Sequence, residues 1–362
     1  MGVPTIDEDL MQITRIRPAA LSGAQLDSLV AEVVAFDTRE NAASGLGPDF
    51  GPLPTQVRQA LRASTRYTTR EFWVGRLGGE IVAKGTAHLG LVDNTDQAEV
   101  WLAVDPARRR QGLGSALLAR MEADLTGSGR TRLLSFNEVP VEECTAARRQ
   151  AHLAAASGVG SLSLGVPSVA FLARHGFVLE QLERCSAART ATAAGIDIGD
   201  FDPDYSILTW SGATPEEHLA GMAVLHQRMS TDTPGAQRLS EEERWDEERV
   251  RELDAERARS GERMHTALAL HGDAAAGFTE VAESLDRPEA GWQGATIVAK
   301  EHRGHRLGAH LKIANHTALA AATGVRRVYT WNAAENSWML AINDLAGFAT
   351  HAWTGVWQKR LA

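Results

Sequence analysis

The chain has 362 residues, more than one hydrophobic core usually serves, so we expect two domains. Its formal net charge is −9, and no apolar run approaches the roughly 20 residues that span a bilayer, so we expect it to bind neither nucleic acid nor a membrane. Its two cysteines and 12 histidines show no metal-ligand spacing, which argues against a metal site and favours a reducing, cytoplasmic setting.

In the first half, helix and strand signals alternate. Ser22 and Gln25 form the pattern of a capping box, so we expect a helix to begin there. Gly78-Gly79 separates two apolar runs and indicates a hairpin. The further elements expected are strands over 71–77, 80–92, 98–104, 131–137 and 177–185, a helix over 114–125, and a helix that begins near Pro167 and ends before Gly176.

The second half opens with Thr-Pro-Glu-Glu at 214–217, a pattern that predicts a capped helix start. The charged run 241–263 is expected to form a solvated helix with Trp245, Val250 and Leu253 facing inward. The alternative for this run is a lid over an acceptor site. The remaining elements expected are strands over 264–271, 277–284 and 292–298 and a helix over 307–323.

The two halves repeat each other. Residues 102–114 align without a gap over residues 296–308, at a constant offset of 194 that places Gly114 on Gly308. Each half then continues with a strand that ends in asparagine, and each closes with a Gly-Phe pair after a helical run. Several shared landmarks in the same order indicate a tandem duplication.

The first half differs from the second by an insertion at 138–165, which we expect to form a helix and a loop long enough to cover a site or an interface. The repeat therefore predicts an N-terminal domain over 10–190, a joining segment at 191–213 and a C-terminal domain over 214–362.

The repeated stretch reads as a strand, a glycine turn and a helix. Backbone N–H groups at a helix N-terminus are unpaired and carry partial positive charge, and glycine lets an anion approach them closely. Flanking arginines such as Arg109 and Arg110 can add charge-assisted hydrogen bonds. A phosphate is therefore the expected guest, and the alternative is an ordinary turn that uses Gly112 and Gly114 for geometry alone.

The stretch Arg109-Arg110-Gln111-Gly112-Leu113-Gly114 resembles the coenzyme A loop of the Gcn5-related N-acetyltransferases (GNAT), in which Arg/Gln-x-x-Gly-x-Gly/Ala follows a strand. The segments 104–106, 171–177 and 332–348 resemble other parts of that family, so the resemblance covers both halves. It implies an α/β (α+β) fold of two tandem acyl-CoA N-acyltransferase domains, each with a mixed, splayed central sheet flanked by helices.

The resemblance also implies which residues hold acetyl-CoA, the expected cofactor. The loops would bind the pyrophosphate, the preceding strand ends would lie near the thioester, and two asparagines of the second half would contact the pantetheine arm. For Asn332 the alternative is a helix cap paired with Glu335. The expected residues are Leu102, Ala103, Val104, Arg109, Arg110, Gln111, Gly112, Leu113, Gly114, Ser115, Ile297, Val298, Arg303, Gly304, His305, Arg306, Leu307, Gly308, Asn332 and Asn336.

The sequence identifies the catalytic groups less clearly than it identifies the coenzyme A loop. GNAT relatives often place a tyrosine acid four residues before the glycine of the Gly-Phe pair, and those positions hold Leu172 and Asn343, which cannot serve as that acid. Glu99 is the best candidate for a general base, although strict alternation turns it away from the end of its strand unless a bulge intervenes. Glu280 and Glu283 are the candidates in the second half, and each of the three could equally have no catalytic role.

These features predict an acetyl-CoA-dependent N-acetyltransferase that acts on the amine of a small molecule. The alternatives are a non-catalytic acyl-CoA binder and one active half with a structural partner half. Because Arg306 stands where the first loop has Gly112, we expect the first half to bind acetyl-CoA more tightly. His302 and His305 are expected to be solvated. The chain start lacks the pattern of a signal peptide, and we expect a cytoplasmic monomer or homodimer.

Overall fold

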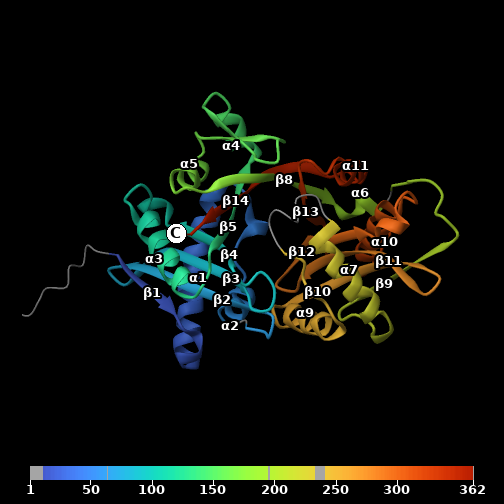
Figure 1. Cartoon of the computed structure of the whole chain (residues 1–362), viewed down its shortest axis with the longest axis horizontal. Coiled ribbons are helices and arrows are strands. Elements are labelled where there is room, and N and C mark those ends of the chain that lie inside the picture. Colours follow the sequence, from blue (N-terminus) through green and yellow to red (C-terminus); the bar gives the residue numbers. More distant parts are fainter. Residues whose placement is uncertain (1–10, 63, 195, 233–240, 362) are drawn as a thin grey trace, which may run out of the picture. The chain divides into compact units, whose positions relative to one another are not determined.

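A computed structural model describes residues 11–62, 64–194, 196–232 and 241–361 (Figure 1). The chain divides into two compact units. The first contains Met1–Phe136, Arg174–Phe177 and Trp357–Ala362, and the second contains Asn137–Ala173 and Val178–Val356. Each unit is a mixed sheet flanked by helices, which confirms the expected fold class. The domain limits drawn from the repeat remain a prediction, because the units follow contacts and not the repeat.

The sheet of the first unit is an antiparallel meander from β1 to β4, followed by β5, which runs parallel to β4. Its elements are β1 (Gln12–Ile16), η1 (Pro18–Ala20), α1 (Gly23–Ser44), η2 (Pro48–Phe50), α2 (Pro54–Arg62), β2 (Thr68–Leu77), β3 (Glu80–Gly90), β4 (Gln97–Val104), η3 (Pro106–Arg108), α3 (Leu113–Gly127) and β5 (Arg132–Pro140), which leaves the unit after Phe136. The capping box at Ser22 and Gln25 is present, and the β2–β3 hairpin turns at Gly78 and Gly79 with φ of 54° and 82°.

Helices α1 and α3 cover opposite faces of this sheet. Apolar side chains of α1 pack against Phe72, Val74 and Ile81. On the other face Met121 of α3 fills the space beside Gly85, where an added Cβ would lie 2.4 Å from the sulfur. Alternation along the strands thus separates the two layers. The sequence did not predict β1 or α2, because β1 is only five residues long and α2 is polar with one buried side chain.

The sheet of the second unit has the order β9-β10-β11-β12-β13-β8. Its elements are α4 (Val141–Ala147), β6 (His152–Ala154), β7 (Ser161–Ser163), α5 (Pro167–Arg174), β8 (Val178–Arg189), α6 (Thr190–Ala194), β9 (Tyr205–Ser211), η4 (Glu216–His218), α7 (Leu219–Asp232), α9 (Glu247–Arg259), β10 (Glu262–His271), β11 (Ala274–Ser284), β12 (Arg287–Val298), η5 (Lys300–His302), α10 (Leu307–Ala322), β13 (Arg327–Ala333), α11 (Ser337–Leu345) and β14 (Ala349–Arg360), whose last residues belong to the first unit. Helices α7 and α9 pack with Leu268 and Phe278, whereas the start of α10 packs with Ala267 and Ala269 on the opposite face.

Three local expectations need correction in the second unit. The insertion contains the predicted helix, α4, but the rest of it holds the small β6–β7 hairpin in place of a plain loop. The charged run forms a shorter helix, α9, because the Asp246 side chain caps it at the Arg249 amide and Trp245 precedes it. Thr214 caps no helix: its backbone amide donates to Asp254, and a 3-10 turn with Pro215 before it leads into α7.

Each unit is completed by a segment from the other half of the chain. Strand β8, from the first half, pairs antiparallel with β13 inside the second unit, from Arg189 opposite Arg327 to Glu183 opposite Ala333. The last residues of the chain return to the first unit, where the Leu361 amide donates to the Thr131 carbonyl at 2.8 Å. Within the described residues, no helix is both long and apolar enough to cross a bilayer.

Candidate functional site

In the first unit, β4 and β5 separate where the glycine loop begins. The two strands pair in parallel only from Gln97 opposite Arg132 to Val100 opposite Ser135. Beyond that point β4 runs on to Val104 against β3, with no pairing to β5 in the described residues. The expected thioester contacts, Leu102, Ala103 and Val104, all lie on this unpaired part. The opening confirms the splayed sheet that the resemblance implies.

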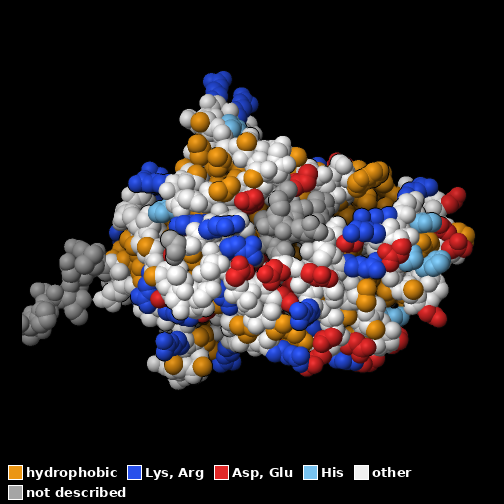
Figure 2. Space-filling view, in the orientation of Figure 1, with side chains coloured by type: hydrophobic (Ala, Val, Ile, Leu, Met, Phe, Trp, Pro, Cys, Tyr) orange, Lys and Arg blue, Asp and Glu red, His pale blue; other side chains and the backbone are white. Residues whose placement is uncertain are grey.

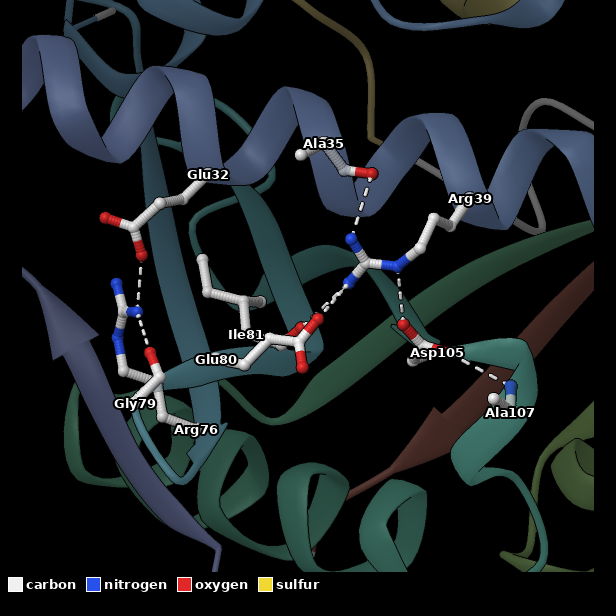
Figure 3. Close-up of polar contacts among 9 residues, drawn as sticks. All are labelled: Glu32, Ala35, Arg39, Arg76, Gly79, Glu80, Ile81, Asp105 and Ala107. Carbon is white, nitrogen blue, oxygen red and sulfur yellow. Dashed lines mark hydrogen bonds and ion pairs between the residues drawn. The ribbon is translucent and has the colours of Figure 1, made fainter.

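The turn after β4 is held in place by helix α1. Arg39 of α1 donates from Nε to Asp105 at 2.7 Å and from a terminal nitrogen to the Ile81 carbonyl at 3.3 Å (Figure 3). Asp105 in turn accepts from the Ala107 amide at 3.0 Å, which caps η3. Burial opposes the charge of Asp105, but the hydrogen bonds from Arg39 and the Ala107 amide lower the pKa of that carboxyl. A charged, fixed Asp105 therefore sets where the loop begins.

The loop itself has left-handed backbone at two positions, Arg110 with φ of 66° and Gly112 with φ of 85°. Arg109 lies between the turn and these positions, and its Nε donates to the Val104 carbonyl at 3.2 Å. Gly112 directly precedes α3, and nothing lies within 4 Å of the place where its Cβ would be. The space beside Gly112 at the start of α3 is thus open, and the N-terminus of a helix with open space beside it suits an anion. At the third residue of α3, Ser115 Oγ lies 2.9 Å from His175 Nε2.

The second loop repeats this backbone conformation. Arg303 Nε donates to the Val298 carbonyl at 3.1 Å, as Arg109 does to Val104. The two left-handed positions are Gly304, with φ of 95°, and Arg306, with φ of 55°. In this half too the neighbouring strands separate, because β12 and β13 pair only from Ala290 opposite Arg327 to Trp292 opposite Tyr329.

The side chains of the second loop are engaged by the segment that leads into β9. His305 Nδ1 lies 2.6 Å from an Asp202 oxygen, and Arg306 donates to the Ile198 carbonyl at 2.9 Å. His302 Nδ1 lies 3.1 Å from the Tyr205 hydroxyl. His305 is exposed, as expected, and His302 is partly buried, and both histidines also contact this segment. Figure 2 shows histidine side chains gathered on this part of the surface.

The three candidate carboxylates have different surroundings. Glu99 lies opposite His88 in the β3–β4 ladder, with 3.5 Å between Oε2 and Nδ1, and about a third of each side chain is exposed. No register shift interrupts that ladder, so Glu99 and Val104 point to opposite faces of β4. The bulge that would turn them to the same face is absent here. Glu99 shares its face with Trp101, whose ring stacks on Phe136 with 5.6 Å between centroids.

The second half does contain a bulge, between Thr279 opposite Thr296 and Val281 opposite Gln293. Both candidate carboxylates of this half, Glu280 and Glu283, have side-chain partners. Arg257 donates two hydrogen bonds to Glu280, at 3.1 and 2.9 Å. Burial alone would raise the pKa of the Glu280 carboxyl, but the charge and hydrogen bonds of Arg257 lower it. Glu283 Oε2 lies 3.0 Å from His265 Nε2. Neither carboxylate is an open base in this structure.

A buried polar cluster lies beneath α10. Lys312, only 2% exposed, donates to Asn343 Oδ1 at 2.7 Å, and the Asn343 amide donates to Asn332 Oδ1. Burial lowers the pKa of Lys312 to about 7. Asn332 caps no helix, since it lies within β13; Asn336 caps α11 by accepting from the Met339 amide. Sequence analysis missed Lys312, although the repeat places it where the first half has Leu118.

Comparison with known proteins found a matching family model and several similar solved structures. A family model of the acetyltransferase (GNAT) domain matches residues 68–179. A solved tandem GNAT protein from the clavulanic acid biosynthesis pathway is 23% identical, with a TM-score of 0.76 over 98% of this chain and 99% of that chain. A GCN5-related N-acetyltransferase from Sphaerobacter thermophilus is 14% identical, with a TM-score of 0.60 over 98% of this chain and 96% of that chain.

A third similar structure is the GCN5-related glucosamine N-acetyltransferase region of a fungal multi-domain β-N-acetylglucosaminidase. It is 13% identical, with a TM-score of 0.64, over 97% of this chain and 38% of that chain. None of the curated proteins matches the sequence. The likeness to the solved structures therefore concerns the fold, which is a tandem GNAT fold along nearly the whole chain.

Proposed function

We propose that the chain is an acyltransferase of the GNAT type, which transfers an acyl group from acyl-CoA to the amine of a small molecule. The match to the GNAT domain at residues 68–179 and the tandem fold support this proposal. Acetyl is the acyl group we expect. The observation that carries the proposal is the first loop, where left-handed backbone at Gly112, open space beside it and the start of α3 make a cradle for a pyrophosphate.

The residues of the first unit fit that role. The amides from Gly112 to Ser115 would hold the phosphates, while Arg110 adds a cation and Arg109 stays fixed to the strand end. Acyl-CoA, when bound, supplies an activated acyl group. The opening between β4 and β5 offers Leu102, Ala103 and Val104 as the strand edge along which the acyl group would lie, with a backbone N–H available to its carbonyl oxygen.

Glu99 is proposed as the base that accepts the proton of the attacking amine, through water. It is partly exposed, close to His88, and on the same face as Trp101, so an amine acceptor would meet a carboxylate and an aromatic ring. Transfer forms the C–N bond and breaks the C–S bond. Leu172 offers no proton to the departing sulfur, so solvent supplies that proton in this proposal.

The first unit is proposed to bind the coenzyme and the second unit to bind it weakly or not at all. In the second loop the Arg306 guanidinium and the His305 ring already contact Ile198 and Asp202. A carboxylate at the mouth of the loop repels an incoming phosphate. The family match also falls in the first half.

The test is CoA release from acetyl-CoA in the presence of a panel of small amines, together with calorimetric titration of acetyl-CoA. Turnover with one strong site per chain is the expected result. Tight binding without CoA release from any amine would favour the alternative, a non-catalytic acyl-CoA binder, which the lack of a tyrosine at Leu172 and Asn343 also suggests.

A further inference from the structure

Three polar side chains on the outer strands of the second unit form a line of hydrogen bonds that acyl transfer in the first unit does not use. Ser211 is the last residue of β9 and lies directly opposite His265 of β10. Its Oγ lies 2.8 Å from His265 Nδ1, and His265 Nε2 lies 3.0 Å from Glu283 Oε2 on β11. A hydroxyl, an imidazole and a carboxylate in this order are the groups that activate a serine nucleophile.

The direction of proton donation along this line follows from the chemistry of its ends. A carboxylate only accepts, so His265 Nε2 donates to Glu283. His265 Nδ1 is then the accepting nitrogen, and the Ser211 hydroxyl donates to it. Serine hydrolases commonly use the two ring nitrogens in the reverse order, but either nitrogen can accept a proton. His265 is therefore placed to take the hydroxyl proton when Ser211 attacks a carbonyl carbon.

The three side chains differ in exposure in the way that such a reaction requires. His265 and Glu283 are 3% and 4% exposed, whereas Ser211 is exposed. The Arg263 guanidinium lies 3.7 Å from Glu283 Oε2, and the Asn315 amide donates to the His265 carbonyl at 2.9 Å, which fixes β10 against α10. A substrate can thus reach the hydroxyl, while the imidazole and the carboxylate are held inside the unit.

The backbone at Ser211 offers a donor for the negative oxygen that forms during such an attack. In the described part of the second unit, β9 is the edge strand and pairs only with β10. The Gly212 amide donates to the Met264 carbonyl at 2.8 Å, and amides alternate in direction along a strand, so the Ser211 amide points away from β10. The amide of the nucleophile itself is one of the usual donors to this oxygen.

These residues lie far from the second loop. In the β11–β12 ladder, Val298, just before the loop, is opposite Gly277, whereas Gly291 at the other end is opposite Glu283. The strand from Gly277 to Glu283 spans about 20 Å at the usual rise of about 3.3 Å per residue. The line of hydrogen bonds is therefore separate from the coenzyme A loop of its own half.

We propose that Ser211, His265 and Glu283 form a second catalytic site, which hydrolyses small carboxylic esters. Ser211 Oγ bonds to the acyl carbon as the bond from that carbon to the alcohol oxygen breaks, and His265 Nδ1 passes the serine proton to the departing alcohol. Water then attacks the acyl-serine through the same base, which releases the carboxylic acid and returns a proton to Ser211. Glu283 is a positioning residue, because it holds the imidazole with Nδ1 as the acceptor.

The experiment treats the full chain with a fluorophosphonate, a reagent that labels activated serines, and locates the label by mass spectrometry of peptides. Labelling of Ser211 is expected, together with hydrolysis of 4-nitrophenyl acetate. Ser211→Ala should abolish both, and His265→Gln should lower both rates at least about 100-fold. Ser206→Ala is the matched control, because Ser206 is exposed on the same strand but lies opposite Leu270, and it should react as wild type does.

Two substitutions of the carboxylate test its positioning role. Glu283→Gln should lower the labelling rate at least about tenfold, and Glu283→Asp, which keeps the charge, should recover part of that loss. Ser211→Ala should keep the turnover of acetyl-CoA, which separates this proposal from the one for the first unit. The proposal is overturned if Ser211 of wild type is not labelled, if His265→Gln with a wild-type circular dichroism spectrum is labelled as fast as wild type, or if Ser211→Ala hydrolyses the ester at the wild-type rate.

Discussion

In the first loop Arg110 and Gly112 have positive φ, at 66° and 85°; in the second the corresponding residues are Gly304 and Arg306, at 95° and 55°. Each loop thus places one glycine and one arginine at the two left-handed positions, in opposite order. A non-glycine residue in this conformation costs roughly 1–2 kcal/mol, and each loop carries that cost once. Backbone strain therefore does not distinguish the loops. The difference lies in the partners of the second loop, which come from residues 198–202.

The helices that follow the two loops also differ, in the polarity of their buried faces. The first half has an open loop above an apolar helix face, and the second has an engaged loop above a polar one. A duplicated fold can therefore change its loop and its interior separately. This comparison yields four predictions.

The largest expected effect is on the open loop. Gly114→Trp should abolish measurable acetyl-CoA binding at the strong site, because an indole at the first turn of α3 blocks the approach of a pyrophosphate to the amides. Gly114 is only partly buried, so the variant should stay folded, which circular dichroism can verify. The matched control is His305→Ala in the second loop, which should leave the strong site unchanged. Unchanged affinity in Gly114→Trp would mean that the loop is only a turn.

The second prediction locates catalysis. Glu99→Gln should lower kcat about 100-fold with little change in the KM for acetyl-CoA, which is the usual scale for loss of a general base. The matching residue of the second half is already glutamine, Gln293, which is buried and donates to Thr279. Gln293→Glu serves as the comparison and should not restore turnover in the Glu99 variant. Steady-state rates across pH decide the question, and an equal kcat in Glu99→Gln would remove Glu99 from the mechanism.

The third prediction concerns the interior of the second unit. Lys312 has an ordinary pKa of 10.5 and a pKa of about 7 in the folded chain. Between these values the unfolded state binds more protons than the folded state, so the free energy of unfolding rises with pH. From pH 7 to pH 9 this rise should be about 2 kcal/mol, at 1.36 kcal/mol per pH unit.

Lys312→Leu should remove that rise, and the difference between wild type and variant isolates it from other titrating groups. His316 does not interfere in this window, because burial and the nearby Lys312 lower its pKa to about 3. Denaturant titration of both proteins at several pH values provides the measurement. Parallel pH profiles would show that Lys312 keeps its charge when buried.

The smallest effect is expected on the acetyl-CoA affinity of the second site when the contacts of the second loop are removed. Arg306→Gly removes the contact with Ile198 and the positive φ of a non-glycine residue. It should strengthen acetyl-CoA binding at the second site about tenfold, or roughly 1.4 kcal/mol. Asp202→Asn should act in the same direction by removing the carboxylate beside His305. Titration against the Gly114→Trp background shows the second site alone, and a weaker site in Arg306→Gly would identify Arg306 as a phosphate ligand.

Much of the fold follows from local patterns that the sequence displays. The capping box at Ser22, the Gly78-Gly79 hairpin and the repeated strand-loop-helix stretch are all formed by residues close in the chain. The alignment also placed Arg306 on Gly112, and both positions have left-handed backbone in the structure. It did not show that Arg110 also has left-handed backbone, because φ at a non-glycine residue has no sequence signature.

Long-range partners could not be predicted in the same way. The segment at 198–202 meets the second loop about 100 residues later in the chain, and no pattern in either stretch encodes that contact. Lys312 was overlooked because a lysine within an apolar helical run usually lies at the surface, whereas here it is 2% exposed. Comparing the halves position by position, with Leu118 as the counterpart, would have identified it.

The exchange of strands between the units bears on how the chain is made. A ribosome that has finished the first half has produced β8, yet in the folded protein β8 pairs with β13, which is not synthesised until residues 327–333. The first unit meanwhile lacks one of its segments, because the residues from Trp357 onward are made more than 200 residues after β5. Neither unit can close before these later segments have been synthesised, so the nascent chain carries unpaired strand edges until then. Synthesis of the segment from Trp357 onward is thus the step that completes the first unit, and a truncation before Trp357 would leave that unit, the one with the open loop, without its part of β14.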